Sequence, residues 1–289
     1  MERSPQRDIL RAMHWSRFGL ALALAACAGC APTYSQKRRA EAERLRTAVD
    51  ATAPMPRPEL AWRALGTSVK GRPLRVASIG HGPRRVLWIG GIHGDEREGR
   101  VATEELPTAF VGVPGAVDRV TLTILEDANP DGTAMKTRGN ANGVDLNRNY
   151  PAKNFKPVRA FGIKPLSQPE SRVVHDLILD GNFDLVIVAH SWRDDHFINY
   201  DGPAAAAASA ALFAARSGYP VRDSGDMSPT PGSLGSWVGR TLNVPILTLE
   251  YHRGRDPWAA WEETRIAIVA VIVEGPGLAA LPSTEEDAR

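Results

Sequence analysis

Two histidines and two glutamates are the residues of this sequence whose types and spacing could act together as a catalyst. His93 and Glu96 lie three residues apart in WIGGIHGDEREG, where an apolar run gives way to a glycine turn and then to charge. His190 ends a second apolar run, FDLVIVAH, and Glu250 ends a third, PILTLE. A catalytic zinc ion takes three protein ligands and keeps a fourth position for water. Two imidazoles and one carboxylate are available here, from His93, Glu96 and His190.

A zinc hydrolase also needs a base that takes a proton from water and passes it to the leaving nitrogen. Glu250 is the candidate, because a carboxylate that follows an apolar strand must be paired, close to a metal or protonated. The structural alternative is an ion pair of Glu250 with Arg253 or Arg255. For His93 and Glu96 the alternative is a solvated loop, and for His190 a strand-end histidine satisfied by hydrogen bonds.

The segment TRGNANGVDLNRNYP, residues 137–151, holds the next candidates. Arginine binds a carboxylate through two parallel hydrogen bonds, so Arg148 beside Asn147 would suit a terminal carboxylate. Arg138 would suit a developing oxyanion. Asp145 could accept a hydrogen bond from a zinc-bound histidine and so fix its tautomer. The alternative is an arginine-bearing surface loop.

Hydrophobic patterning predicts the elements that must position these residues. Strands are expected at 72–80, 84–91, 118–127, 183–190 and 244–251, the first two as a hairpin across HGPR. Helices are expected at 97–106, 167–181, 203–217, 232–243 and from Asp256 to about Val273. Ser167 and Glu170 would form a capping box at the start of the second helix.

The strands are apolar throughout and are separated by helices, which predicts an α/β domain with a mostly parallel sheet covered on both faces. In open sheets of this kind ligands bind at the carboxyl ends of the strands. The polar clusters after four of these strands are therefore expected to meet at one edge.

Composition sets limits on the class of protein. The 289 residues are 43% hydrophobic and 24% charged, which is ordinary for a globular chain, and the formal net charge is +2. No basic cluster indicates a nucleic-acid partner. Both cysteines, Cys27 and Cys30, lie near the N-terminus, so a metal in the rest of the chain must be held by His, Asp or Glu.

The N-terminus reads as an export signal. A basic segment precedes the apolar run FGLALALAAC, which is too short to span a bilayer as an anchor. LAAC resembles a bacterial lipobox, in which Cys27 would carry lipid and hold the protein at a membrane. A plain signal peptide cleaved near Ala31 is the alternative, and Met13 could be the true start. Four regions are expected: a leader at 1–30, a charged and Pro-rich tether at 31–58, a catalytic domain at 59–280 and a tail at 281–289.

The sequence resembles the zinc carboxypeptidase family, which includes carboxypeptidase A and the bacterial murein peptide amidases. The motifs GIHGDE, NPDG, TRGNANGVDLNRNYP, SQPES, AHSW, PGSLGSW and PILTLEY occur in family order over about residues 70–255. The resemblance implies one α/β domain with a mixed sheet of about eight strands. It also implies one zinc ion bound by His93, Glu96 and His190, with Glu250 as general base.

The resemblance further implies that Arg138 polarises the substrate carbonyl and that Asn147 and Arg148 bind the substrate's terminal carboxylate. Asp145 would be the hydrogen-bond partner of His93. Carboxypeptidase A-like enzymes carry a mobile tyrosine shortly before the base, and residues 232–243 contain none. Together with HGDE, NPDG and the short domain, this favours the murein peptide amidase branch.

Enzymes of that branch cleave the bond between γ-D-glutamate and meso-diaminopimelate, so the expected substrate is a peptidoglycan fragment with a free carboxylate. The expected location is the periplasmic side of a bacterial membrane. Because diaminopimelate carries an extra amine and carboxylate, its pocket should hold both charges, for which WRDDH at 192–196 is a candidate and a solvated loop the alternative. Two other functions stay open: an N-acyl-amino-acid deacylase of the aspartoacylase type, and a non-catalytic cell-wall peptide binder.

Overall fold

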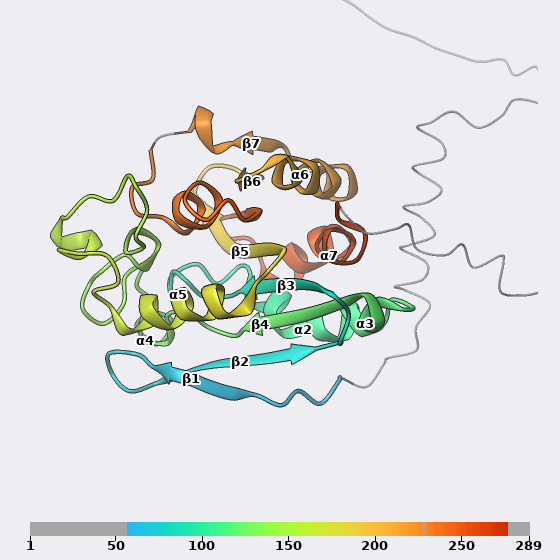
Figure 1. Ribbon diagram of the computed structural model, residues 1–289, viewed down its shortest axis with the longest axis horizontal. Helices are drawn as coiled ribbons and strands as arrows, with labels where there is room; N and C mark the ends of the chain where they lie inside the picture. Colours follow the sequence, from blue (N-terminus) through green and yellow to red (C-terminus); the bar gives the residue numbers. More distant parts are fainter. Residues whose placement is uncertain (1–56, 228, 277–289) are drawn as a thin grey trace, which may run out of the picture. The chain divides into compact units, whose positions relative to one another are not determined.

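A computed structural model describes residues 57–227 and 229–276 (Figure 1). The predicted leader with Cys27, nearly all of the tether, and the tail lie outside the described residues. In the described ranges, none of the helices combines the length and hydrophobicity that a bilayer crossing needs.

One mixed sheet of eight strands organises the described residues, in the order β1-β2-β4-β3-β5-β8-β6-β7. Its centre is parallel, since β3 pairs in parallel with β4 and β5, and β5 pairs in parallel with β8. The predicted α/β fold with a mostly parallel sheet is confirmed. The strands are β1 (Arg63–Thr67), β2 (Pro73–Ile79), β3 (Arg84–Ile89), β4 (Val120–Leu125), β5 (Leu185–Trp192), β6 (Phe197–Asp201), β7 (Val221–Asp223) and β8 (Ile246–His252).

The predicted hairpin between the first two apolar runs is wrong. β2 pairs with β1 and β4, both antiparallel, and β4 separates it from β3. The connecting turn packs against the segment before β4, with the amide of His81 donating to the carbonyl of Val117 at 2.8 Å. Gly80 adopts a φ of +83°, and a side chain there would meet the carbonyl of Val120. The turn is therefore shaped to make room for a third strand.

Helices cover both faces of the sheet (Figure 1). Side chains of α2, α6 and α7 pack on one face, and those of α5 pack on the other with residues 144–152 and the π-helical turn Gly235–Gly239. The helices are α2 (Arg100–Val111), α3 (Ala116–Arg119), α4 (Pro130–Met135), α5 (Pro169–Gly181), α6 (Ala204–Ser217) and α7 (Pro257–Glu274).

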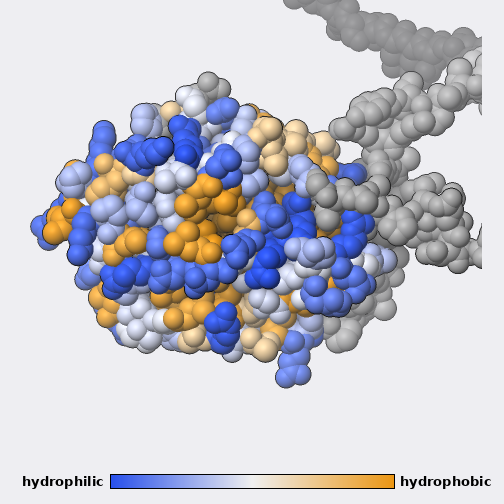
Figure 2. Space-filling view, viewed as in Figure 1, coloured by the Kyte–Doolittle hydropathy of each residue, from blue (hydrophilic) through white to orange (hydrophobic). Residues whose placement is uncertain are grey.

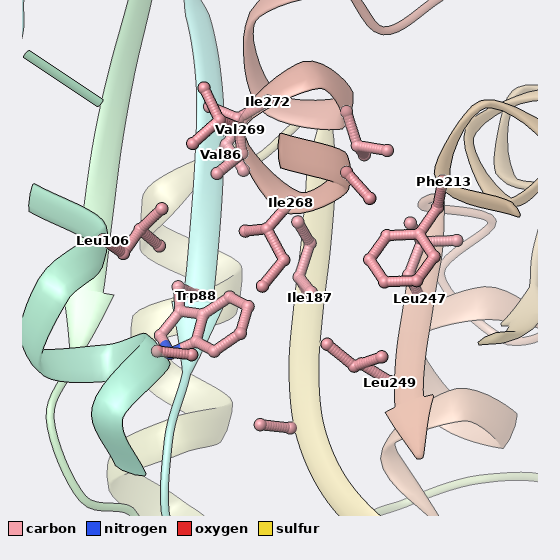
Figure 3. Packing of buried hydrophobic residues seen from close by; sticks show 14 of the residues in the cluster. Val86, Trp88, Leu106, Ile187, Phe213, Leu247, Leu249, Ile268, Val269 and Ile272 are labelled. Atoms are coloured by element: carbon pink, nitrogen blue, oxygen red, sulfur yellow. The ribbon is translucent and has the colours of Figure 1, made fainter. Parts of the chain in front are cut away.

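The central strands are apolar on both faces because each face has its own core. Along β3, Val86 and Trp88 belong to the cluster under α2 and α7, whereas Leu87 and Ile89 belong to the cluster under α5. Figure 3 shows the first cluster, in which Leu106 of α2 approaches the β3 side chains. All five side chains are fully buried. The sheet edge that carries the polar residues is thus fixed by packing from both sides.

The sequence predicts the N-cap of α7 correctly but not that of α5. Asp256 caps α7, accepting from the amides of Trp258 and Ala259 at 3.1 and 3.0 Å. The predicted capping box of α5 is wrong, because Gln168 is the N-cap residue and its side chain makes no cap bond. Ser167 instead accepts from Asn149, and Glu170 accepts from the Asn140 side chain and the Val69 amide.

We predict that Leu106→Ala lowers the free energy of unfolding by about 2–5 kcal/mol, because it removes fully buried methyl groups and leaves a cavity. Urea denaturation at equilibrium measures this change. Leu179→Ala on the exposed side of α5 is the matched control, expected within about 0.5 kcal/mol of wild type. Equal losses of unfolding free energy in the two variants would contradict the packing of α2 on the sheet.

Candidate metal centre and cleft

Neighbouring strands of the sheet deliver the site residues to one edge. His93 and Glu96 follow β3 in the turn that leads to α2. His190 lies in β5 and Glu250 in β8, and the two face each other as Cα partners in the parallel ladder. The distance between these two residues is therefore set by the hydrogen bonds of the sheet rather than by a loop.

His93, Glu96 and His190 converge closely. Their candidate ligand atoms all lie within 4.8 Å of one another, and all three side chains are buried. The two Nδ1 atoms are 3.0 Å apart, and the Glu96 carboxylate lies 2.9 Å from Nδ1 of His93 and 3.0 Å from Nδ1 of His190. The spacing predicted from sequence thus brings two imidazole nitrogens and one carboxylate to a common point.

The donor set fits a zinc ion. Two ligands about 2.1 Å from one tetrahedral ion lie roughly 3.4 Å apart, close to the separations seen here. Nε2 of His93 lies 3.0 Å from the Asp145 carboxylate, so this nitrogen carries the proton and Nδ1 presents its lone pair to the cluster. Oε2 of Glu250 is also buried and has no hydrogen-bond partner among the described residues. We therefore assign this centre to one zinc ion held by the three residues.

Electrostatics within the cluster favour an ionised Glu96. Burial alone would raise the pKa of Glu96, but the two histidines outweigh it and hold that pKa well below its usual range. Burial lowers the pKa of His190 to about 4, which leaves this imidazole neutral as a metal ligand requires. Burial also acts to lower the pKa of His93, yet Glu96 and Asp145 overcome it and the net pKa is raised.

Arg138 forms hydrogen bonds to the carboxylates of Glu96 and Asp145, beside the histidines. Its Nη1 donates to Oε1 of Glu96 and its Nε to Oδ2 of Asp145, both at 2.9 Å. Asp145 also accepts from the backbone amide of Asn147 at 2.9 Å. The predicted carbonyl polariser therefore lies against the metal ligands, and its guanidinium lines the same cleft.

Asn147 and Arg148 lie at the cleft but differ in what they contact. The Asn147 amide is engaged by the protein, with Nδ2 at 3.1 Å from Nε2 of His190 and Oδ1 accepting from the Leu234 amide at 2.9 Å. Asn147 thus contacts His190 through an amide nitrogen that donates, whereas the Asp145 carboxylate accepts from His93. Arg148 donates once, to the Asn147 carbonyl at 2.6 Å, and stacks over Phe161 at 5.9 Å. Of the pair predicted to bind a carboxylate, Arg148 has the more available donors.

Glu250 lines the cleft beside the ligand cluster. Burial, followed by the charge of Glu96, raises its pKa to about 8. The predicted alternative, an ion pair with Arg253 or Arg255, does not form among the described residues. Arg253 pairs with Asp95 at 2.5 Å, and Arg255 pairs with Glu263. Glu250 is left lining the cleft, where the positive charge of a zinc ion would favour the ionised form that a proton acceptor needs.

The cleft beyond the metal centre contains residues that sequence reasoning missed. It has a volume of about 620 Å³, including space open to solvent, and Asp201 of β6 lines it. This carboxylate is 8% exposed and accepts from Oγ of Ser224 at 2.7 Å and from Nε of Arg240 at 2.8 Å. Around it lie the polar side chains of Asn199, Ser224, Thr230, Ser233 and Thr248. The short strand FINYD carried no strong strand signal, and Asp201 is separated in sequence from every motif.

The WRDDH segment contributes only its tryptophan to the described cleft. Asp195 pairs with Arg222, and the His196 ring contacts the Tyr219 ring in a tilted arrangement, with 4.4 Å between ring centres. Arg193 and Asp194 are exposed. The charges expected to recognise diaminopimelate thus do not line the described cleft, whereas Asp201 does.

The zinc carboxypeptidase family model matches residues 57–250. Murein peptide amidase A of Escherichia coli is 30% identical over 232 residues, which is 73% of this chain and 81% of that protein. Carboxypeptidase SOL1 of Arabidopsis thaliana is 32% identical over 140 residues, and the chain spans 28% of its length.

Solved structures agree with the fold. The crystal structure of a murein-tripeptide amidase from Escherichia coli O157 aligns with a TM-score of 0.60 at 26% identity, covering 75% of this chain and 93% of that one. Carboxypeptidase A of Helicoverpa armigera aligns with a TM-score of 0.58 over 83% of this chain and 73% of that chain. At 18% identity, this second match shows the fold alone.

We predict that His93→Ala loses stoichiometric zinc, because it removes one of three protein ligands. Glu250→Gln should keep it, since Glu250 is not in the ligand cluster. Metal content after dialysis, measured by inductively coupled plasma mass spectrometry, distinguishes the two variants, and circular dichroism confirms that both are folded. A folded His93→Ala protein with one bound zinc per chain would contradict the ligand assignment.

Proposed function

Because the chain belongs to the zinc carboxypeptidase family, we propose that it hydrolyses an amide bond beside a free carboxylate in murein peptides. The proposed bond joins γ-D-glutamate to meso-diaminopimelate. The observation that carries the proposal is the cleft itself, whose lining includes the three zinc-centre residues, Glu250, Arg148 and Asp201. The murein peptide amidases among its relatives support the choice of substrate.

The residues of the chain divide the chemistry among them. A zinc ion held by the His93, Glu96 and His190 cluster would act as a Lewis acid and promote the ionisation of water. Glu250, unpaired and poised beside the cluster, accepts the proton from water and delivers it to the leaving nitrogen.

Charge around the cleft orients the substrate. Arg148 binds the terminal carboxylate, and Arg138 stabilises negative charge that develops on the carbonyl oxygen. Arg138 already braces the ligand carboxylates, so its guanidinium is held in place before substrate arrives. No reorganisation of this cation is then needed during the reaction.

Asp201 suits the amine of the diaminopimelate side chain. A buried carboxylate needs compensation, and Arg240 and Ser224 supply part of it. An ammonium group of the substrate would add a third partner at the cleft side.

We also propose that the protein acts on the periplasmic side of a bacterial membrane, held by lipid on Cys27. The leader sequence supports this location, and murein lies within reach of a protein anchored there. The tether at 31–58 would connect the lipid to the catalytic domain at 59–280.

Digestion of purified murein tripeptide, followed by mass spectrometry, tests the function. We expect free diaminopimelate as product, loss of activity with a chelator and recovery on addition of zinc. Glu250→Gln should bind zinc and lower kcat by about 10²- to 10⁴-fold, because the proton acceptor is lost. Release of the acyl group from N-acyl amino acids instead would favour the deacylase alternative. Binding of the tripeptide without cleavage would favour the binder.

We predict that Asp201→Asn raises KM for the murein tripeptide by roughly 10- to 100-fold, as expected for losing a hydrogen bond between charged groups. The variant should lose little against an analogue whose diaminopimelate side-chain amine is acetylated. Steady-state kinetics with both peptides measures the difference. Asp194→Asn, an exposed carboxylate outside the described cleft, is the matched control. Equal effects of Asp201→Asn on the two peptides would contradict recognition of the amine.

A further inference from the structure

A loop beside the cleft carries a run of unbalanced positive charge. Residues 151–168, here called the basic loop, contain Lys153, Lys156, Arg159 and Lys164. With Arg148 just before it, the stretch from 146 to 169 holds five cationic residues and no acidic one. Such a run is commonly a solvated surface, so its meaning depends on where these charges lie.

The four cations of the basic loop are exposed, and none forms an ion pair within the part of the chain that the structure describes. The loop projects beside α4 and α5, on the left in Figure 1. Figure 2 shows hydrophilic residues on this side, interspersed with hydrophobic ones. The charges are therefore free to act on molecules in solution.

Backbone and side-chain contacts fix the basic loop to the cleft. The Ala160 carbonyl accepts from the amide of Asp145, the partner of His93, at 2.8 Å. Asn154 accepts from the Gly232 amide and donates to Oγ of Ser236, both at 3.1 Å. Residues 230–235 form a wall of the cleft. The loop thus connects the back of the metal centre to this wall.

Positive charge is concentrated here rather than spread over the molecule. The whole chain has 35 basic and 33 acidic residues, and without these five the remainder would hold 30 against 33. The segment 192–227, which lines the cleft with Asp201, contains five acidic and three basic residues. The cleft is therefore lined in part by a mildly acidic segment, and hydrogen bonds join its wall to a loop of net positive charge.

We propose that the basic loop is an electrostatic docking surface that draws multiply carboxylated peptides to the cleft, with their carboxylates toward Arg148. This inference rests on the proposed function and extends it to how the substrate arrives. A γ-linked D-glutamate keeps its α-carboxylate, and diaminopimelate adds two more, so the tripeptide carries three carboxylates against two amines. Charges that steer an oppositely charged ligand toward its site raise the local concentration of that ligand and its association rate by 10- to about 1,000-fold.

Two fourfold variants with the same number of substitutions test the proposal. The neutral variant is Lys153→Gln, Lys156→Gln, Arg159→Gln and Lys164→Gln. The charge-conserving variant is Lys153→Arg, Lys156→Arg, Arg159→Lys and Lys164→Arg. None of these residues lines the described cleft. Single variants Arg159→Gln and Lys164→Gln serve if the neutral variant does not fold.

The readout is kcat/KM for the murein tripeptide in a series of salt concentrations. We expect the neutral variant to lose about tenfold at low salt through KM, with kcat unchanged, and to match wild type at high salt, where charges are screened. The charge-conserving variant should follow wild type throughout. Each single neutral variant should show a smaller loss of kcat/KM at low salt than the fourfold neutral variant. Indistinguishable kcat/KM values for the neutral and charge-conserving variants at low salt would overturn the proposal.

A binding measurement separates this proposal from the proposed function. The same variants are made in the Glu250→Gln background and titrated calorimetrically with the tripeptide and with its form amidated at the D-glutamate α-carboxylate. Failure of wild type to cleave the tripeptide would refute the proposed function, while these titrations would still test the loop. We expect the neutral variant to bind the tripeptide about tenfold more weakly than wild type does. The ratio of its Kd values for the amidated and the unmodified tripeptide should also be smaller than that of wild type. An unchanged preference would refute docking by charge.

Discussion

A buried carboxylate, Glu96, is the group on which the rest of the site depends. Its ionised form would be costly at an almost inaccessible position unless several donors faced it. It contacts both histidines, the Arg138 guanidinium and the Ser191 amide at distances of 2.9–3.0 Å. These partners come from three separate parts of the chain. Satisfying this one charge therefore holds together the strand ends and the 138–148 segment that surround the cleft.

Much of this arrangement could be predicted because it depends on local patterns. Apolar runs separated by helices specify a covered parallel sheet, and polar residues at the ends of such runs must meet at its carboxyl edge. His93, Glu96, His190 and Glu250 follow that rule, and the structure brings them together. The resemblance to zinc carboxypeptidases added the roles of the 138–148 segment, which polar composition alone would leave as a loop.

What could not be predicted depends on contacts between distant segments. The four-residue connection after β2 was predicted to close a hairpin, yet β4 enters between the strands from 40 residues further on. Ser167 and Glu170 had the spacing of a capping box but bond to Asn149 and Asn140. Asp201 lies on a five-residue strand beside β8, and only the strand order places it in the cleft. Sequence patterns describe individual elements, whereas these features depend on which elements become neighbours.

The pairing of His190 with Glu250 across β5 and β8 has a consequence for how such proteins can change over time. Inserting or deleting one residue within either strand would turn alternate side chains to the opposite face, so Leu249 or Tyr251 would replace Glu250 beside the metal centre. The connections at 153–158 and 229–233 lie outside the helices and strands, where changes in length are tolerated. Variation among relatives should therefore alter which peptides are accepted while the spacing of the reacting groups stays constant. In an alignment of relatives, differences in the length of these loops would then indicate different substrate specificities. Strands β5 and β8 without insertions or deletions would indicate an active hydrolase.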